Sequence, residues 1–203
     1  MRPDLAIVPT GTANLASVMA AFSRLGARPE VVLTPAQAER VRRIVLPGVG
    51  SFGAAMAELD RNGLRRVLNE RIEDGRATLA VCVGMQLLST RSDESQDAVG
   101  LGSVAEDVTR FPDTVRVPQL GWNQVVAGPD SRFVDDGWAY FANSYRLATV
   151  PDGWAAAMTD HGGQFVAAME RGEVLACQFH PELSGRWGSD LLRRWFETTA
   201  EEA

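Results

Sequence analysis

The chain has 203 residues, of which 45% are hydrophobic, and a formal net charge of −6 at pH 7. This length suffices for one domain with a sizeable core, so we predict a single domain over residues 1–203. The acidic balance argues against a nucleic-acid partner bound through its phosphates, and no apolar run approaches a membrane span. We therefore expect a cytoplasmic protein that binds neither nucleic acid nor membrane.

The first half of the chain alternates between apolar runs and amphipathic segments. Strands are predicted at 4–9, 29–34, 43–48 and 77–83. Helices are predicted at 13–26, 35–41, 51–75 (broken near Asn62-Gly63) and 84–92, with Gly26 ending the first. Strands separated by helices imply right-handed crossovers and a parallel sheet covered on both faces.

The second half is richer in strands. Strand-like runs divided by turn residues lie at 100–111, 117–128, 137–149, 153–160, 163–172 and 173–182. A terminal helix is predicted over 189–203, with Ser189 as its N-cap. The whole pattern predicts an α/β fold with a mixed, mostly parallel central sheet flanked by helices, and with antiparallel strands in the C-terminal half.

Cys82 stands where a buried strand turns into a helix. Functional groups of open α/β sheets collect at the carboxyl ends of strands. The turn after Cys82 would direct backbone N–H groups toward the thiol, and Gly84 would relieve crowding there. The alternative is that Cys82 is a small buried hydrophobic residue, which is the commonest role of a free cysteine.

The segment CQFHPEL offers two partners for such a thiol. Pro181 favours extended backbone at His180, so that His180 and Glu182 point to the same side. The carboxylate can then hold one ring nitrogen while the other exchanges a proton with the thiol. The alternative is a core histidine beside a surface glutamate.

The segment LPGVGSFG follows the third predicted strand. Gly48 and Gly50 permit unusual backbone angles, so that the N–H of Val49 or its neighbour, together with that of Val83, can form an oxyanion hole. A phosphate-binding loop is disfavoured because its lysine is missing, and a plain turn stays open. Two distant cysteines and only two histidines indicate neither a disulfide framework nor a metal site.

These segments together resemble the class I glutamine amidotransferases, which have a flavodoxin-like fold. The sequences VCVGMQLL and CQFHPELSG carry the resemblance to the class. The sequences TGTANLASV, LPGVGSFGAAM, GWN and GLG (100–102) are similar to one branch, the glutaminase subunits of imidazole glycerol phosphate synthase.

The resemblance implies a reaction and a partner. Cys82 would attack the side chain of L-glutamine, His180 would transfer the proton, and Glu182 would orient His180. Gln86, with Gly48 and Gly50, would bind the substrate, and no cofactor or metal would be needed. The ammonia would pass to a (βα)8-barrel cyclase subunit that makes imidazole glycerol phosphate and an aminoimidazole carboxamide ribotide in histidine biosynthesis.

The sequence departs from this branch at four positions. Ala80 replaces a glycine before the nucleophile, Gln119 and Asn143 replace histidines, and Leu183 replaces a basic residue. We expect the cyclase to bind the face that carries Gln119, Trp122, Asn123, Asn143 and Leu183. Two alternatives stay open: an amidotransferase subunit that serves a different synthase, and a non-catalytic interaction module.

Overall fold

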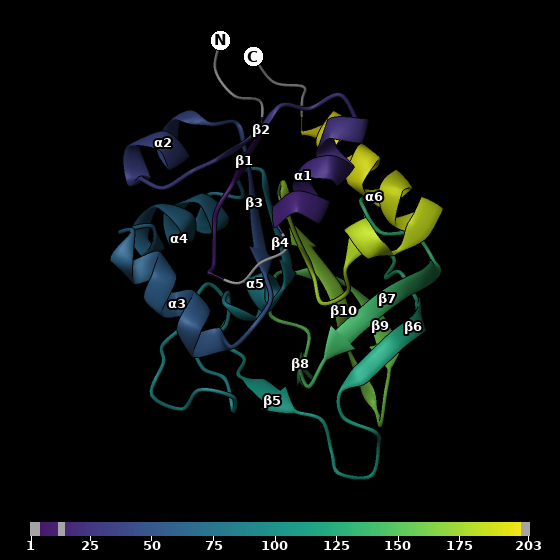
Figure 1. The fold of residues 1–203 in the computed structure, drawn as a ribbon. Coiled ribbons are helices and arrows are strands. Elements are labelled where there is room, and N and C mark those ends of the chain that lie inside the picture. The colour runs from purple at the N-terminus through teal and green to yellow at the C-terminus, as the bar shows by residue number, and fades with distance from the viewer. Residues whose placement is uncertain (1–4, 12–14, 200–203) are drawn as a thin grey trace.

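A computed structural model describes residues 5–11 and 15–199 of the chain (Figure 1). Thr12, Ala13 and Asn14 of the TGTANLASV segment lie outside the described residues, as do the outermost residues of the first predicted strand and of the terminal helix.

The centre of the fold is a seven-stranded sheet with the strand order β2-β1-β3-β4-β11-β10-β9. The first five of these strands are parallel, and β10 and β9 extend the sheet in antiparallel fashion. Their bounds are Leu5–Ile7 (β1), Pro29–Val31 (β2), Arg43–Gly48 (β3), Thr78–Cys82 (β4), Ala155–Asp160 (β9), Gln164–Arg171 (β10) and Val174–Cys177 (β11). Every residue of β3, β4 and β11 is buried, as expected for parallel strands covered on both faces.

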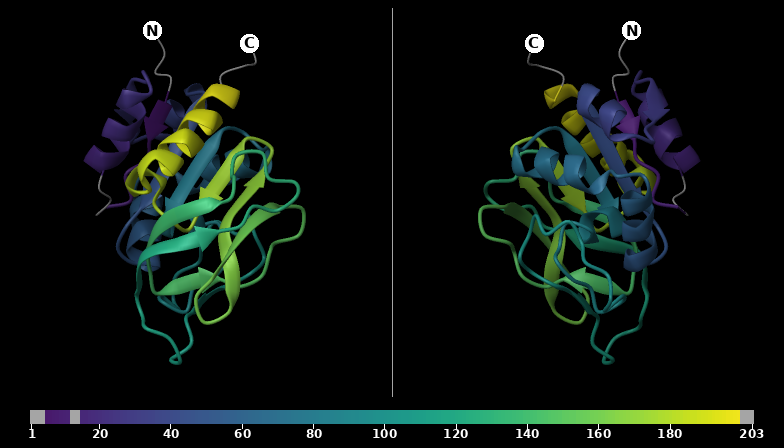
Figure 2. Two further views of the ribbon diagram at one scale, coloured as in Figure 1. Left: turned by 90° about the vertical axis from the view of Figure 1, so that its right-hand side faces the viewer. Right: turned by 90° about the vertical axis from the view of Figure 1, so that its left-hand side faces the viewer.

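Helices cover both faces of this sheet. The views in Figures 1 and 2 place α3 (Phe52–Arg61) and α4 (Arg65–Glu73) on one side and α6 (Gly185–Thr198) on the other. The helix α2 (Pro35–Arg40) contacts α4, and α1 (Leu15–Arg24) packs on α6 through the Phe22 and Trp195 rings, whose centroids are 6.1 Å apart. The predicted mixed α/β fold is therefore confirmed.

A buried arginine links α4 to the residues just before β3 and β4. The guanidinium of Arg71 donates hydrogen bonds to the carbonyl oxygens of Val41 (3.2 Å), Arg42 (2.8 Å) and Ala77 (3.0 Å). Burial, aided by the charges of Arg76 and Arg42, lowers the pKa of Arg71 to about 10.

Two smaller ribbons lie below α6 in Figure 2. One pairs β6 (Gln119–Val125) with β7 (Gly137–Asn143), and the other pairs β5 (Val108–Arg110) with β8 (Tyr145–Leu147), both antiparallel. The strand β5 covers only the end of the run predicted at 100–111, so the prediction of a strand over its first residues is wrong.

Two of the four predicted helix boundaries agree with the structure. Gly26 has a φ of 85° just after α1, and Gly63 has a φ of 66° between α3 and α4, so the predicted stop and break are confirmed. The helix predicted over 84–92 is wrong in length, because α5 spans only Val83–Gln86. Ser189 is not an N-cap: α6 begins at Gly185, and the Ser189 hydroxyl donates to the Gly185 carbonyl (2.9 Å).

Candidate active site

Cys82 is the last residue of β4, and α5 begins at the next residue. Its φ of 54° and ψ of −113° form a sharp strand-to-helix turn, and no other described non-glycine residue has a positive φ. The conformation is one that residues with a side chain rarely adopt, and such strain is concentrated at functional sites. The side chain of Cys82 is thereby carried out of the sheet at the carboxyl end of β4.

Two glycines allow β3 to pass directly under this turn. A Cβ atom on Gly84 would lie 2.0 Å from the Leu46 carbonyl oxygen, and one on Gly48 would lie 2.4 Å from the Gly84 nitrogen. The predicted role of Gly84 is confirmed. Gly50 has a φ of 94°, as expected, whereas Gly48 has no positive φ and is needed for space alone.

His180 and Glu182 reach the same site from the segment after β11. His180 is extended (φ −100°, ψ 96°), and Glu182 follows in a short 3-10 helix, Pro181–Leu183. The His180 Nδ1 and Glu182 Oε1 atoms are 2.9 Å apart. The His180 backbone is fixed at both ends, because its N–H donates to the Tyr140 carbonyl and its carbonyl accepts from the Ser184 hydroxyl.

The electrostatics link this imidazole to the thiol. Burial alone lowers the pKa of His180, but hydrogen bonds to Cys82 and Glu182, together with their negative charges, raise it to about 10. Cys82 is 4% exposed and His180 is 6% exposed, so water screens these interactions little. The arrangement of thiol, imidazole and carboxylate can perform nucleophilic acyl transfer.

A hollow of about 230 Å³ opens beside the triad. Its lining includes Gly48, Val49, His180, Glu182 and Leu183. Val49 thus borders the hollow, and Val83 follows the nucleophile directly in the chain. Their role as oxyanion donors stays a prediction, as does substrate binding by Gly48, Gly50 and Gln86.

One residue of this site was missed from the sequence. The side chain of Gln178 is fully buried, and its Nε2 atom lies 3.8 Å from the Cys82 sulfur. Its Oε1 atom accepts a hydrogen bond of 3.0 Å from the Gln86 side chain. The signal available was its spacing, since Gln178 and His180 are two residues apart in the run predicted as a strand at 173–182, where such residues are expected to point to the same side.

The residues expected at a partner interface fall into two groups. Trp122 and Leu183 are exposed by 55% and 46%, and Asn123 is partly exposed. Gln119 and Asn143 are cross-strand neighbours on the buried face of the β6–β7 ribbon, so they lie beneath this surface. The outer face of the ribbon also exposes Leu120 and Trp138.

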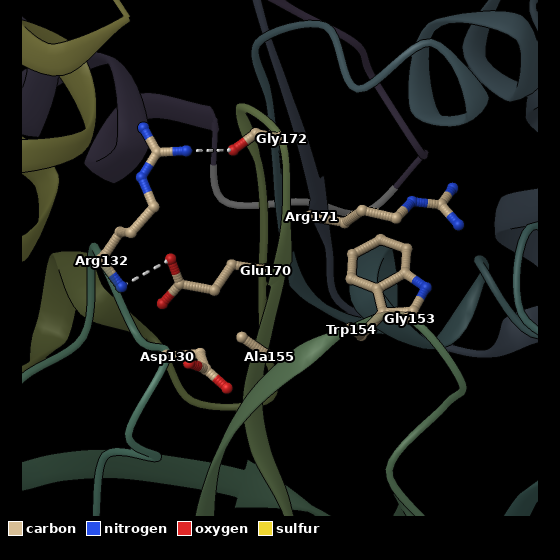
Figure 3. Close-up of a pocket in the computed structure, with 8 residues that line it drawn as sticks. All are labelled: Asp130, Arg132, Gly153, Trp154, Ala155, Glu170, Arg171 and Gly172. Carbon is tan, nitrogen blue, oxygen red and sulfur yellow. Dashed lines mark hydrogen bonds between the residues drawn. The ribbon is translucent and has the colours of Figure 1, made fainter.

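A second hollow lies at the opposite end of the sheet (Figure 3). Its buried carboxylate, Glu170, accepts hydrogen bonds from the backbone N–H groups of Arg132 and Phe133, and the Arg171 guanidinium stacks on the Trp154 ring at 4.6 Å. These charged groups already have structural partners. Within the described residues, no group of three or more His, Cys, Asp or Glu side chains is placed to hold a metal ion, and no helix is long and apolar enough to cross a membrane.

Comparison with known proteins agrees with this geometry. The pattern of the family "Glutamine amidotransferase class-I" matches residues 7–198. The "Imidazole glycerol phosphate synthase subunit HisH" of Methanothermobacter thermautotrophicus is 40% identical over 196 residues, which cover 95% of this chain and 98% of the relative. The "Imidazole glycerol phosphate synthase hisHF, chloroplastic" of Arabidopsis thaliana is 38% identical over 91% of this chain and 32% of its own length.

Solved structures show the same fold. A crystal structure described as a glutamine amidotransferase superposes with a TM-score of 0.77 at 19% identity, covering 97% of this chain and 98% of the other. The chain therefore belongs to the class I glutamine amidotransferases and, within them, to the glutaminase subunits of imidazole glycerol phosphate synthase.

Proposed function

We propose that Cys82, His180 and Glu182 hydrolyse L-glutamine to glutamate and ammonia. The observation that supports this most directly is the strained turn at Cys82, which presents the thiol to an imidazole held by a carboxylate at 2.9 Å. The Cys82 sulfur attacks the amide carbon of the glutamine side chain and forms a C–S bond. His180 gives its proton to the departing nitrogen, the C–N bond breaks, and a glutamyl thioester is left.

His180 then acts as a base. It takes a proton from water, and the resulting hydroxide attacks the thioester carbon. The C–S bond breaks, glutamate leaves, and the thiolate-imidazolium pair is restored. Glu182 keeps the imidazole oriented during both half-reactions, and N–H groups of Val49 and Val83 stabilise the oxyanion in each. Gly48, Gly50 and Gln86 bind the substrate.

The ammonia is used by a partner. Relatives of nearly the same length are named as subunits of imidazole glycerol phosphate synthase, and in Arabidopsis the related segment is part of a longer chain named hisHF. We infer that this chain, a single cytoplasmic domain, forms a heterodimer with a (βα)8-barrel cyclase that makes imidazole glycerol phosphate and an aminoimidazole carboxamide ribotide. Near neutral pH free ammonia is mostly protonated, so direct transfer keeps it nucleophilic.

An apolar surface beside the triad suits such a partner. Leu120, Trp122 and Trp138 are exposed by 65%, 55% and 57% on the outer face of the β6–β7 ribbon. Leu183 borders the hollow that contains His180, and it is exposed by 46%. Aromatic and aliphatic side chains of this kind anchor stable interfaces. A cyclase bound here would receive ammonia where the thioester forms.

Labelling with an electrophilic glutamine analogue tests the nucleophile. We expect the label on Cys82 and loss of glutamine hydrolysis in Cys82→Ala, with the fold retained. Cys177 is the internal control, because it is fully buried and burial raises the pKa of its thiol well above its ordinary value. Label found mainly on Cys177 would contradict the assignment.

The partner is tested by glutamine turnover in three samples: the chain alone, with the cyclase, and with the cyclase and its nucleotide ligand. We expect low, higher and highest rates, because a partner that orients one more oxyanion donor changes the rate by roughly a hundred- to a thousand-fold. Equal rates, with complex formation established independently, would refute this activation. If no complex forms, the chain serves a different synthase.

A further inference from the structure

A chain of buried side-chain amides lies behind the nucleophile. The Gln178 Nε2 atom is 3.8 Å from the Cys82 sulfur, and the Gln86 Nε2 atom is 3.0 Å from Gln178 Oε1 and 3.2 Å from the carbonyl oxygen of Tyr145. Gln178 is fully buried and Gln86 is 4% exposed. Besides His180, the sulfur therefore faces a second protein group, the Gln178 amide, whose orientation can be worked out.

The orientation follows from the far end of the chain of amides. The Tyr145 carbonyl can only accept, so Gln86 must direct its NH2 group toward it. The second hydrogen of that NH2 group is then available to Gln178, which must present its oxygen. The NH2 group of Gln178 is consequently left facing Cys82. Asn143 donates to the same Tyr145 carbonyl at 3.0 Å, which uses its second lone pair.

We propose that Gln178 is a further catalytic residue whose amide N–H binds the Cys82 sulfur and favours its thiolate, and that Gln86 is the positioning residue that fixes this amide. A neutral thiol is a weak acceptor, whereas hydrogen bonds to a charged acceptor are roughly twice as strong as neutral ones. A fully buried amide that points at sulfur is thus best satisfied by the thiolate. The bond is strongest when the sulfur is charged, before attack and again as the thioester C–S bond breaks.

This inference rests on the proposed glutaminase function, because it assigns a catalytic role to a neighbour of the proposed nucleophile. It also assigns Gln86 a duty besides substrate binding, since both hydrogens of its amide are directed to protein acceptors. Neither residue belongs to the Cys-His-Glu triad.

The test measures the thiolate directly, without glutamine. The rate of alkylation of Cys82 by iodoacetamide is followed against pH in the wild type, in Gln178→Met and Gln178→Glu, and in Gln86→Met. Gln164→Met is the matched control, because it makes the same chemical change at an exposed end of β10. Cys82→Ala gives the background from Cys177.

We expect the pH of half-maximal alkylation to rise by about one unit in Gln178→Met, which is about tenfold less reaction at a fixed pH below the midpoint. In Gln178→Glu this midpoint should rise further, because a carboxylate repels the thiolate. The midpoint should rise less in Gln86→Met than in Gln178→Met, and in Gln164→Met it should equal that of the wild type. Glutamine turnover should fall in the same order as the midpoints rise.

A wild-type midpoint in folded Gln178→Met would overturn the proposal, even if turnover fell. Iodoacetamide needs no substrate site, so failure of the glutaminase proposal would appear separately, as absent turnover in the wild type. If Gln178→Met does not fold, as judged by its melting curve, the proposal is tested by an NMR titration of the wild-type protein. The side-chain amide protons of Gln178 should then shift with the same midpoint as Cys82 alkylation, and their failure to do so would overturn the proposal.

Discussion

Replacing Gly84 by alanine tests whether close packing under the nucleophile turn sets the activity. The new Cβ atom would lie 2.0 Å from the Leu46 carbonyl oxygen, and ordinary contact begins at 3.4 Å. The two backbones must therefore separate by about 1.4 Å, a difference taken from these two distances. Neither side can yield by rotating a side chain, because Leu46 contributes a carbonyl of the buried strand β3.

The magnitudes follow from that displacement. Overpacking of this kind lowers stability by roughly 1–3 kcal/mol. The higher helix propensity of alanine than of glycine offsets at most about 1 kcal/mol of this loss. A misplacement of about 1 Å at a reacting group can cost about a hundredfold in rate. We expect Gly84→Ala to lose at least that much glutamine turnover while it unfolds at somewhat lower urea concentration.

Gly53→Ala is the matched control. Its Cβ atom would lie 3.0 Å from the Ser95 Oγ, 3.2 Å from the Ser95 Cβ and 3.6 Å from the Ala98 Cβ, so Ser95 must move by only a few tenths of an ångström. Gly53 lies in α3, where alanine is preferred, so stability should be unchanged or slightly higher. Measurements are urea unfolding and glutamine turnover in the presence of the partner. Wild-type stability and turnover in Gly84→Ala would refute the packing argument.

Four further predictions concern the triad and the core. In Cys82→Ala the pKa of His180, measured by NMR, should fall from about 10, because burial lowers it and the hydrogen bond that the ring donates to Cys82 is lost; His161, the other histidine, is the internal reference. In the wild type the contribution of His180 to the free energy of unfolding should be complete below about pH 6.5 and disappear as the pH rises toward 10, and a pH-independent contribution would count against the assignment. Glu182→Gln should retain more turnover than His180→Asn, since an orienting group is partly dispensable, and the reverse order would show that the roles are misassigned. Arg71→Met should lower the free energy of unfolding by about 3 kcal/mol or more, because it removes the hydrogen bonds that the buried guanidinium donates to the carbonyls of Val41, Arg42 and Ala77, whereas Arg186→Met on the exposed surface should change it by less than about 0.5 kcal/mol.

The sequence predicted the sheet well where the physical signal is local. The strands β3 and β4 are buried on both faces and read as continuous apolar runs, and the glycines after α1 and α3 mark the ends of those helices. The Cys-His-Glu combination was also accessible, because two of its members are two residues apart and the third ends a strand.

The errors arose where distant backbone groups replace local hydrogen bonds. After α5 the apolar residues Leu87 and Leu88 continue a helical pattern, but their carbonyls accept from the N–H groups of Leu101 and Val104. The helix therefore ends although the residues stay buried. At α6 the 3-10 turn of Pro181–Leu183 leads directly into the helix, and Gly188, which resembles a helix breaker, allows contact with the Pro181 carbonyl.

Gln178 was missed for a related reason. A polar residue after a buried strand has no distinctive local pattern, and its contact with Cys82 depends on the pairing of β11 with β4, in which Cys177 lies opposite Val81. That register joins residues almost a hundred positions apart. Spacing alone would place Gln178 on the side of His180, but only the register shows that this side faces the sulfur.

The strained backbone at Cys82 has a cost in stability and a consequence for the direction of the sulfur. A φ of 54° suits glycine, and holding a residue with a Cβ in a sparsely populated conformation costs about 1–3 kcal/mol. The same strain points the sulfur out of the sheet toward His180 and Gln178, a direction that a regular strand end would not give. Gly48 and Gly84 let β3 and α5 hold the turn in place, so that the strained residue cannot relax without separating these elements. Stability is thus lowered at one residue to keep a nucleophile in a fixed direction, and the surrounding buried strands supply the packing that makes this tolerable.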